Sequence, residues 1–231
     1  MFCDRCGTQV RPDQQFCPNC GQAFAAASAP GAVAPPPVWT PPAAVHVTAG
    51  HWIGAGWEMV KADMGAYVLA ALIFFVLSGV PFIQGALITG FHIYTMKKLA
   101  GRRADFGDLF KGFNYFIPTL VATLLIGVFT FFGTLLCIIP GLVVAAALKF
   151  TYLFIVDKRM DFWPAIQASH AVVKQDYFGF TMFLILAFLV NLLGFVCCIV
   201  GVLVTFPVTI AAVTVAYREI VGFDQRTIDA L

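Results

Sequence analysis

The chain has 231 residues and a formal net charge of +2, and only 11% of its residues are charged. Hydrophobic residues make up 60% of it, and its mean hydropathy is +0.87. A soluble core of this size cannot bury so much apolar surface, so the composition excludes an ordinary soluble protein and predicts an integral membrane protein. The small net charge gives no support for a nucleic-acid partner.

Residues 1–24 carry two Cys-x2-Cys pairs, Cys3 with Cys6 and Cys17 with Cys20, and a glycine follows each pair. Each pair places two thiolates on one edge of a tetrahedron, and together they close a four-thiolate site that has no open position for a catalytic water. The spacing therefore predicts a structural Zn²⁺ ion, which would supply most of the folding free energy of so small a unit. Two structural disulfides are the alternative, but a cytoplasmic placement of this unit, which the charge distribution predicts, disfavours them.

The sequence FCDRCG…FCPNCG resembles the short zinc-ribbon domain found at the N-terminus of many bacterial proteins, often joined to membrane segments. Its two arginines, Arg5 and Arg11, are balanced by Asp4 and Asp13, so this unit lacks the positive surface that binds phosphate. We therefore expect no nucleic-acid binding and instead a cytoplasmic protein partner docked on the zinc ribbon. The alternative is a zinc ribbon that binds no partner.

Residues 25–50 are rich in alanine and proline and carry no charged side chain. This composition predicts an extended, semi-rigid linker, with a proline-rich docking peptide as the alternative. Residues 51–222 then form the membrane domain, and residues 223–231 form a short C-terminal tail.

The membrane domain contains six apolar segments, which predict an all-α domain of six transmembrane helices arranged as three hairpins. Each hairpin turns at a glycine or proline, in the sequences SGVPF, FGTLLCIIPG and GFVCCIVG. The first two segments are short for a bilayer, so we expect the membrane to thin around them. The six segments are residues 64–80, 82–97, 115–136, 139–157, 177–198 and 200–221.

An amphipathic stretch precedes each hairpin, and most of its apolar residues recur every three or four positions, as expected for a helix at the membrane interface. We interpret the three stretches and their hairpins as three copies of one unit; plain amphipathic connectors without repeat ancestry are the alternative. The apolar residues are Trp52, Ile53, Trp57, Val60 and Met64 in the first stretch, Phe106, Leu109, Phe110, Phe113 and Ile117 in the second, and Phe162, Ile166, Val173 and Phe178 in the third.

The charged residues indicate the orientation of the chain. Apart from Lys149, every lysine and arginine lies outside the three hairpins or, like Lys97 and Arg218, within the last four residues of a hairpin, and the three hairpin turns carry no charge. The positive-inside rule makes the charged side cytoplasmic, with both termini inside. The polar N-terminus does not resemble a cleavable signal peptide. We therefore expect a multi-pass protein of the bacterial plasma (inner) membrane.

Two ionisable residues, Lys149 and His92, fall within apolar segments, about 12 Å and about 8 Å from the cytoplasmic side by helical rise. Because such groups are costly in lipid and tend to mark function, we hypothesise that both line a cytoplasm-facing pocket for an anionic lipid headgroup. The alternatives are a lysine that extends to the interface and a histidine that binds a backbone carbonyl. Asn191 and Gln84 are predicted to tie helices together by hydrogen bonds.

Three further cysteines, Cys137, Cys197 and Cys198, lie near the outer turns. We favour buried apolar packing for them, and a disulfide is the alternative.

The sequences IIPGLVVAAALKFTYLFIVD and AIQASHAVVKQDYFGFTMFLILAFL are similar to a six-helix membrane domain that also occurs fused to glycerophosphodiester phosphodiesterases and in related bacterial proteins. The resemblance implies the fold and a membrane location. It does not imply hydrolysis, because this chain has neither the barrel nor the metal-binding carboxylates of such an enzyme.

The sequence contains no GxSxG, no HExxH, no phosphate-binding glycine loop and no carboxylate pair placed for acid–base work, so we expect no enzymatic activity. The predicted function is that of a scaffold that interacts with membrane lipids and recruits a cytoplasmic protein. The sequence is also compatible with a homo-oligomer. A small-solute or lipid transporter and a zinc- or redox-responsive membrane regulator are the alternatives.

Overall fold

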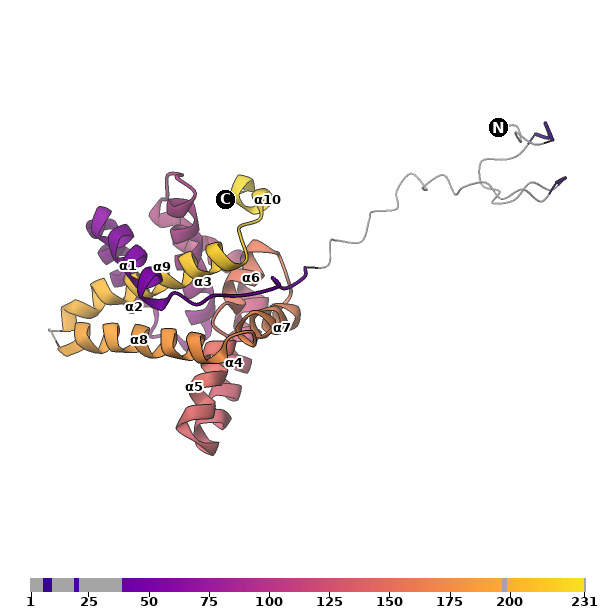
Figure 1. Cartoon of the computed structure of the whole chain (residues 1–231). Helices are drawn as coiled ribbons and strands as arrows, with labels where there is room; N and C mark the ends of the chain where they lie inside the picture. The colour runs from indigo at the N-terminus through magenta and orange to yellow at the C-terminus, as the bar shows by residue number, and fades with distance from the viewer. Residues whose placement is uncertain (1–5, 10–18, 21–38, 197–198, 231) are drawn as a thin grey trace. The chain divides into compact units, whose positions relative to one another are not determined.

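A computed structural model shows the course of the chain (Figure 1). The chain divides into two compact units, residues 1–40 and residues 41–231. The regular elements described in the second unit are all helices, as the sequence predicted for this part of the chain. The residues that the structure describes are 6–9, 19–20, 39–196 and 199–230.

Short connections join the helices of the second unit, and a few segments have 3-10 geometry and are labelled η. In chain order the elements are α1 (Ala49–Ala62), α2 (Met64–Leu77), η1 (Pro81–Ile83), α3 (Gln84–Leu99), η2 (Phe106–Tyr115), α4 (Phe116–Leu136), α5 (Ile138–Ala147), α6 (Thr151–Asp157), α7 (Phe162–Val173), α8 (Tyr177–Val196), η3 (Ile199–Gly201), α9 (Val202–Ile220) and α10 (Gln225–Ala230).

Among the described residues, four helical segments are long and apolar enough to cross a bilayer, and the pair α1–α2, bent by 101°, would make a fifth. The six predicted segments all fall on helices, but α2 has 14 residues and α3 has 16. At the helical rise they measure about 21 Å and about 24 Å, less than the hydrocarbon core of roughly 30 Å. The prediction of six spanning helices is therefore confirmed only in part. The four segments are Phe106–Leu136, Ile138–Asp157, Tyr177–Val196 and Val202–Ile220.

The three hairpins pack in a closed ring. The second part of each hairpin contacts the first helix of the next hairpin: α3 contacts α4, α5 contacts α8, and α9 returns to α2. The amphipathic segment before each hairpin lies on the preceding hairpin in the same sense, with η2 on α3, α7 on α6 and α1 on α9. The three predicted units are therefore equivalent in their packing, and the last unit closes on the first.

Glycines allow two of the amphipathic segments to approach the helix beneath them. A Cβ atom on Gly56 of α1 would lie 2.6 Å from the carbonyl oxygen of Val208 on α9. A Cβ atom on Gly112 of η2 would lie 1.9 Å from the carbonyl oxygen of Ala86 on α3. Real Cβ atoms essentially never approach backbone this closely. The two segments could not lie so near these helices with any other residue at either position.

The centre of the helical unit consists of α3, α6 and the second half of α9, whose residues are almost all buried. Aromatic rings join these helices to one another. The ring of Phe154 on α6 lies 5.1 Å from that of Tyr217 on α9, and Phe91 on α3 lies 5.8 Å from Phe206 on α9. In a bilayer, the hydrophobic effect does not drive helices together, because lipid tails are as apolar as the side chains. Close packing and dispersion between side chains therefore stabilise such a centre.

The outer surfaces of the hairpins are apolar. Ile117 and Leu136 of α4 are 73% and 83% exposed, and Phe178 of α8 is 77% exposed. An apolar surface of this extent is unfavourable in water and matches a hydrocarbon environment. The α4–α5 and α8–α9 hairpins extend from the centre in different directions, with their turns far from it (Figure 1). These two hairpins therefore present apolar surfaces that suit a hydrocarbon environment.

Segments at both ends of the helical unit also pack against it. Gln175 Nε2 donates a hydrogen bond to the carbonyl oxygen of Pro42 (2.8 Å). Beyond α9, the N–H of Asp224 donates to the carboxylate of Asp157 (2.8 Å). Parts of the predicted linker and of the predicted tail therefore lie on the helical unit.

Candidate functional site

The predicted zinc site lies only partly within the described residues. Cys6 and Cys20 are described, whereas Cys3 and Cys17 lie outside the described residues. No group of three or more metal-ligating side chains occurs in the described part of the chain, which includes only half of the predicted ligand set.

Thr8 connects the two Cys-x2-Cys segments. Cys6 Sγ is hydrogen-bonded to Thr8 Oγ1 (3.2 Å), and Asn19 Nδ2 donates a hydrogen bond to the same oxygen (3.2 Å). Asn19 immediately precedes Cys20, so the Thr8 hydroxyl holds the second segment next to the first. This contact fits a site in which four thiolates surround one Zn²⁺ ion.

The outer-turn cysteines can be placed only in part. Cys137 lies exposed between α4 and α5. Its predicted neighbours, Cys197 and Cys198, lie outside the described residues. Burial was the favoured prediction for Cys137, and the exposed position contradicts it, because this residue stands at the end of a hairpin that projects from the centre. Cys137 is a free cysteine, which does not support the alternative of a disulfide at this residue.

His92 lies buried in the centre of the helical unit, where its Nδ1 is 2.8 Å from Thr214 Oγ1 of α9. Thr214 has one hydroxyl proton, which it donates to the carbonyl oxygen of Ile210 (2.9 Å). His92 Nδ1 must therefore donate to the Thr214 hydroxyl. His92 thus joins α3 to α9.

Lys149 lies in a turn between α5 and α6, not inside one continuous helix as the segment 139–157 predicted. The Ser169 hydroxyl of α7 bridges this turn: it donates to the carbonyl oxygen of Ala147 (2.7 Å) and accepts from the N–H of Phe150 (3.1 Å). Backbone groups freed by a helix break are costly in lipid unless other groups bind them. The break is therefore tolerated because Ser169 completes its hydrogen bonds.

The two ionisable residues singled out from the sequence lie on parts of the chain that pack together. Lys149 stands just before α6, and α6 contacts α3, the helix that carries His92. His92 is bound to α9, and Lys149 is half-buried at the turn. The headgroup pocket predicted for this pair stays a prediction.

Ion pairs and charged hydrogen bonds fasten two of the amphipathic segments. Lys97 near the end of α3 binds Asp108 of η2 (2.7 Å), and this pair is almost fully buried. Glu219 near the end of α9 accepts a hydrogen bond from Trp52 Nε1 of α1 (2.6 Å) and lies 3.1 Å from His51 Nε2. In both cases a charge at the end of one hairpin holds the amphipathic segment of the next.

A third ion pair fixes the corner between α1 and α2. Lys98 binds Asp63, which occupies the single residue between these two helices. The hydrogen bond to Asp63 raises the pKa of Lys98, so its ammonium group stays charged at neutral pH. A cavity of about 350 Å³ adjoins this corner and is also lined by Tyr67.

The hydrogen bonds predicted for Asn191 and Gln84 are present. Asn191 Nδ2 donates to Thr209 Oγ1 of α9 (3.3 Å), and Asn191 Oδ1 accepts from Thr205 Oγ1 (3.4 Å). These bonds tie α8 to α9 as expected. Gln84 Nε2 donates to the carbonyl oxygen of Ser78 (3.2 Å), which fastens the turn between α2 and α3.

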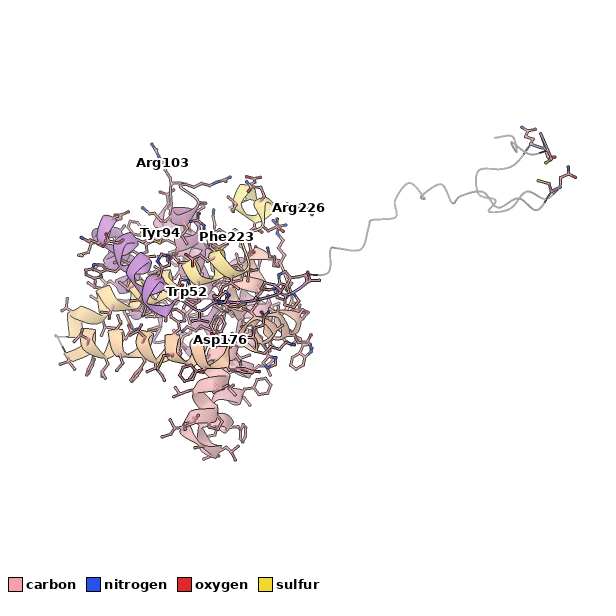
Figure 2. All side chains as sticks on the ribbon, in the orientation of Figure 1. Trp52, Tyr94, Arg103, Asp176, Phe223 and Arg226 are labelled. Atoms are coloured by element: carbon pink, nitrogen blue, oxygen red, sulfur yellow. The ribbon has the colours of Figure 1, made fainter. Side chains whose placement is uncertain are left out.

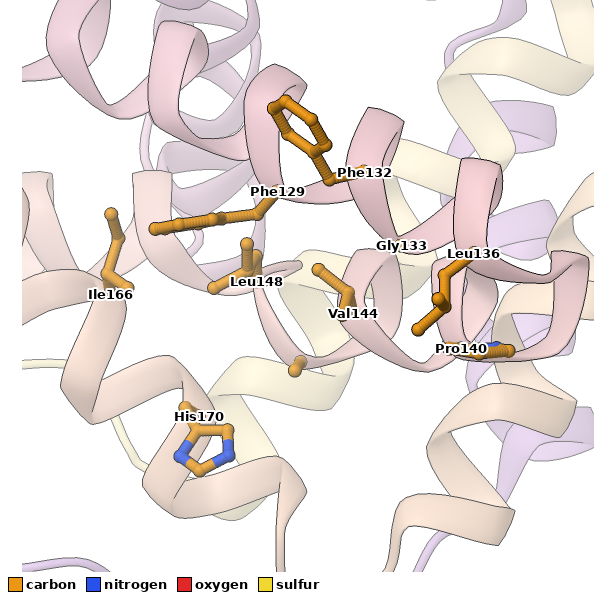
Figure 3. A pocket seen from close by; sticks show the side chains of 10 residues that line it. Phe129, Phe132, Gly133, Leu136, Pro140, Val144, Leu148, Ile166 and His170 are labelled. Atoms are coloured by element: carbon orange, nitrogen blue, oxygen red, sulfur yellow. The ribbon is translucent and has the colours of Figure 1, made fainter.

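An apolar pocket of about 510 Å³ lies between the α4–α5 hairpin and α7 (Figure 3). Phe129 and Leu136 of α4 and Val144 of α5 line it, and His170 of α7 stands apart from these apolar side chains (Figure 3). His170 Nε2 is hydrogen-bonded to the hydroxyl of Tyr177 (2.7 Å). A pocket with this lining suits an acyl chain better than a polar solute.

Comparisons with known proteins identify one domain and some distant relatives. The zinc-ribbon domain family matches residues 2–24. Uncharacterized proteins of Mycobacterium bovis and Mycobacterium tuberculosis are each 33% identical to the chain over 103 residues, which make up 45% of this chain and 32% of each relative. The chain therefore spans about a third of the length of these curated relatives. No solved structure matches the chain.

Neither finding extends to the glycerophosphodiester phosphodiesterases, so that resemblance stays an expectation from the sequence. The chain combines a zinc-ribbon domain near its N-terminus with helices that are able to span a membrane.

Proposed function

We propose that the chain is a non-enzymatic, multi-pass protein of the bacterial plasma membrane whose zinc ribbon docks a cytoplasmic protein at the membrane surface. The observation that carries this proposal is the contrast between its two parts. Residues 2–24 match a zinc-ribbon domain, and the helical unit exposes apolar side chains over its hairpins. Such a surface needs lipid around it, whereas the polar ribbon belongs outside the lipid.

Zinc has a structural role in this proposal. Cys3, Cys6, Cys17 and Cys20 would hold one Zn²⁺ ion in a closed tetrahedral site, and the Thr8 bridge supports their approach. A closed site stabilises the ribbon and leaves its outer surface to bind a partner.

The distribution of charge supports a cytoplasmic position for both termini. The ion pairs Lys97–Asp108 and Lys98–Asp63 and the Trp52–Glu219 bond all lie at helix ends away from the hairpin turns. By the positive-inside rule, this charged side faces the cytoplasm.

The proposal of a non-enzymatic body rests on how its polar groups are used. Asp108 binds Lys97, Asp157 accepts from Tyr217 (2.9 Å), and Glu219 accepts from Trp52. Each of these carboxylates holds two elements together. The body therefore serves as a lipid-embedded anchor, and the docking function belongs to the ribbon.

Affinity purification from membranes tests this proposal. The full chain, a chain without residues 1–24 and the double variant Cys6→Ser/Cys20→Ser are compared by mass spectrometry after crosslinking. We expect a set of soluble proteins that only the full chain captures, and we expect all three forms to remain in the membrane fraction.

Cys137→Ser is the matched control, because it removes a cysteine outside the ribbon. It should capture the same proteins as the unmodified chain. Capture of the same soluble proteins without residues 1–24 would contradict docking through the ribbon, and release of the chain into the soluble fraction would contradict the membrane anchor.

A further inference from the structure

A polar cavity of about 540 Å³ lies where α4 begins and where the connection from α6 to α7 passes. Asn114, Tyr115 and Pro118 line it from the η2–α4 junction, and Arg159 and Asp161 line it from the connection. None of these residues belongs to the predicted zinc site or to the His92–Lys149 pair.

The cavity lies at the edge of the apolar belt. The apolar segment Ile138–Asp157 ends two residues before Arg159. On the other side of the cavity, Ile117 of α4 is strongly exposed and adjoins Pro118 in the sequence. The polar side chains of the cavity therefore lie beside the first turn of α4, which faces lipid in the proposed function. Phospholipid headgroups lie at this depth.

Arg159 has a backbone conformation that glycine normally adopts. Its φ of 50° is the one positive value among the described residues other than glycine. Left-handed geometry is unfavourable for a residue with a Cβ atom, and helices that end in it usually have glycine at that position.

The other two hairpins provide an internal comparison for Arg159. Gly101 and Gly222 stand two residues after the last residues of α3 and α9, with φ of 70° and 76°. Arg159 stands two residues after the last residue of α6, which is the equivalent place in the ring. Two of the three equivalent positions thus have the unstrained residue, and the third has arginine at a cost in backbone strain. The cost points to a role for the guanidinium group in the cavity.

The cavity presents opposite charges that are available to a ligand. Within the described part of the chain, neither Arg159 nor Asp161 takes part in an ion pair, and Asp161 Oδ1 accepts a hydrogen bond from the N–H of Phe162. A guanidinium binds a phosphate diester through two hydrogen bonds, and a carboxylate binds an ammonium group. Asn114 and Tyr115 add polar side chains to the same lining.

We propose that this cavity binds the headgroup of a phospholipid that has a primary amine, with its phosphate on Arg159 and its ammonium group on Asp161. The inference rests on the membrane location in the proposed function, but it does not depend on the zinc ribbon or its partner. A ligand with only a negative charge would leave Asp161 facing it unfavourably, which favours the zwitterionic headgroup over an anionic one.

Lipid competition on the purified full chain tests this proposal. The delipidated chain in detergent is titrated with phosphatidylethanolamine, phosphatidylcholine and phosphatidylglycerol, and bound lipid is counted by native mass spectrometry. We expect phosphatidylethanolamine to be retained best, because the trimethylammonium of phosphatidylcholine has no proton to donate to Asp161 and phosphatidylglycerol has no cation.

Two variants separate the contacts. Arg159→Gly should lower phosphatidylethanolamine binding about tenfold or more, while its melting temperature stays the same or rises because the strain is relieved. Asp161→Asn should still cap α7 and should bind phosphatidylethanolamine and phosphatidylcholine about equally. Arg103→Gln is the control, since it removes an arginine that projects from the loop after α3 (Figure 2), and it should bind lipid as the unmodified chain does.

Equal retention of the three lipids by the unmodified chain, or unchanged phosphatidylethanolamine binding by Arg159→Gly, would overturn the proposal. Equally strong binding of water-soluble glycerophosphoethanolamine would overturn the assignment to a lipid. A lipid preference without any captured partner would leave this inference intact and count against docking through the ribbon. Flotation of the chain with vesicles tests the shared membrane location separately.

Discussion

The indole nitrogen of Trp52 donates a hydrogen bond of 2.6 Å to the carboxylate of Glu219. The two residues lie 167 positions apart, in the first helix of the helical unit and in its last long helix. Trp52 is buried and packs edge-on against Phe183, with the ring centroids 5.2 Å apart. The contact closes the ring of hairpins where no chain connection exists.

Trp52→Phe should lower the free energy of unfolding by about 1–2 kcal/mol, because it removes the donor to a charged acceptor but keeps most of the aromatic packing. Glu219 is 42% exposed, so water replaces part of the lost bond and limits the effect. Thermal unfolding of the purified chain in detergent measures the loss.

His51→Gln is the control for this prediction, because His51 contacts the same carboxylate from an exposed position. Its effect should stay below about 0.5 kcal/mol. Equal losses for the two variants would contradict the view that the buried indole closes the ring.

Thr214→Val should cost about 1–3 kcal/mol, because it leaves the Nδ1–H of His92 without its acceptor in the protein interior. Thr89→Val is matched to it: Thr89 is buried on the same helix as His92, and its hydroxyl has no hydrogen-bond partner within the described residues. That second change should be neutral or stabilising. Equal destabilisation in thermal unfolding would contradict a stabilising role for the hydrogen bond between His92 and Thr214.

Apolar runs located most of the helices because burial and lipid contact act on every residue of a segment. The predicted segments 64–80, 115–136 and 177–198 begin within one residue of α2, α4 and α8 and end within three residues of them. The break at Lys149 could not be found in this way. The stretch AAALKFTYL contains no glycine or proline, and the turn is completed by Ser169, which lies 22 positions from Ala147.

The polar contacts were less predictable from the sequence, because their partners lie far apart in the chain and are brought together by helix packing. His92 was singled out correctly as an unusual residue, but its partner Thr214 lies 122 positions away and is chosen by the packing of α3 on α9. Arg159 gave no signal in the sequence, since the spacing of charged residues does not reveal backbone conformation. Only the ring arrangement shows that Arg159 and Gly222 occupy equivalent positions.

Ser169→Ala should destabilise the helical unit by about 1–3 kcal/mol, because the carbonyl of Ala147 and the N–H of Phe150 both lose their partner at the helix break. Ser78→Ala is a useful comparison: the exposed Ser78 hydroxyl donates only to the carbonyl of Phe75 near a helix end (2.8 Å), so its loss should cost little. Hydrogen exchange measured by mass spectrometry should show faster exchange at the α5–α6 turn in the first variant alone. Unchanged exchange there would mean that Ser169 does not hold the break.

Cys6→Ser should reduce bound zinc from about one ion per chain to almost none, since three remaining thiolates cannot close the tetrahedral site. The melting temperature of the helical unit should not change, because residues 1–40 and 41–231 form separate compact units. Metal analysis and thermal unfolding on the same sample measure both quantities, with Cys137→Ser as the control that keeps its zinc. Retention of zinc by the Cys6 variant would contradict the four-cysteine site, and a fall in melting temperature along with zinc loss would show that the ribbon stabilises the membrane-embedded unit.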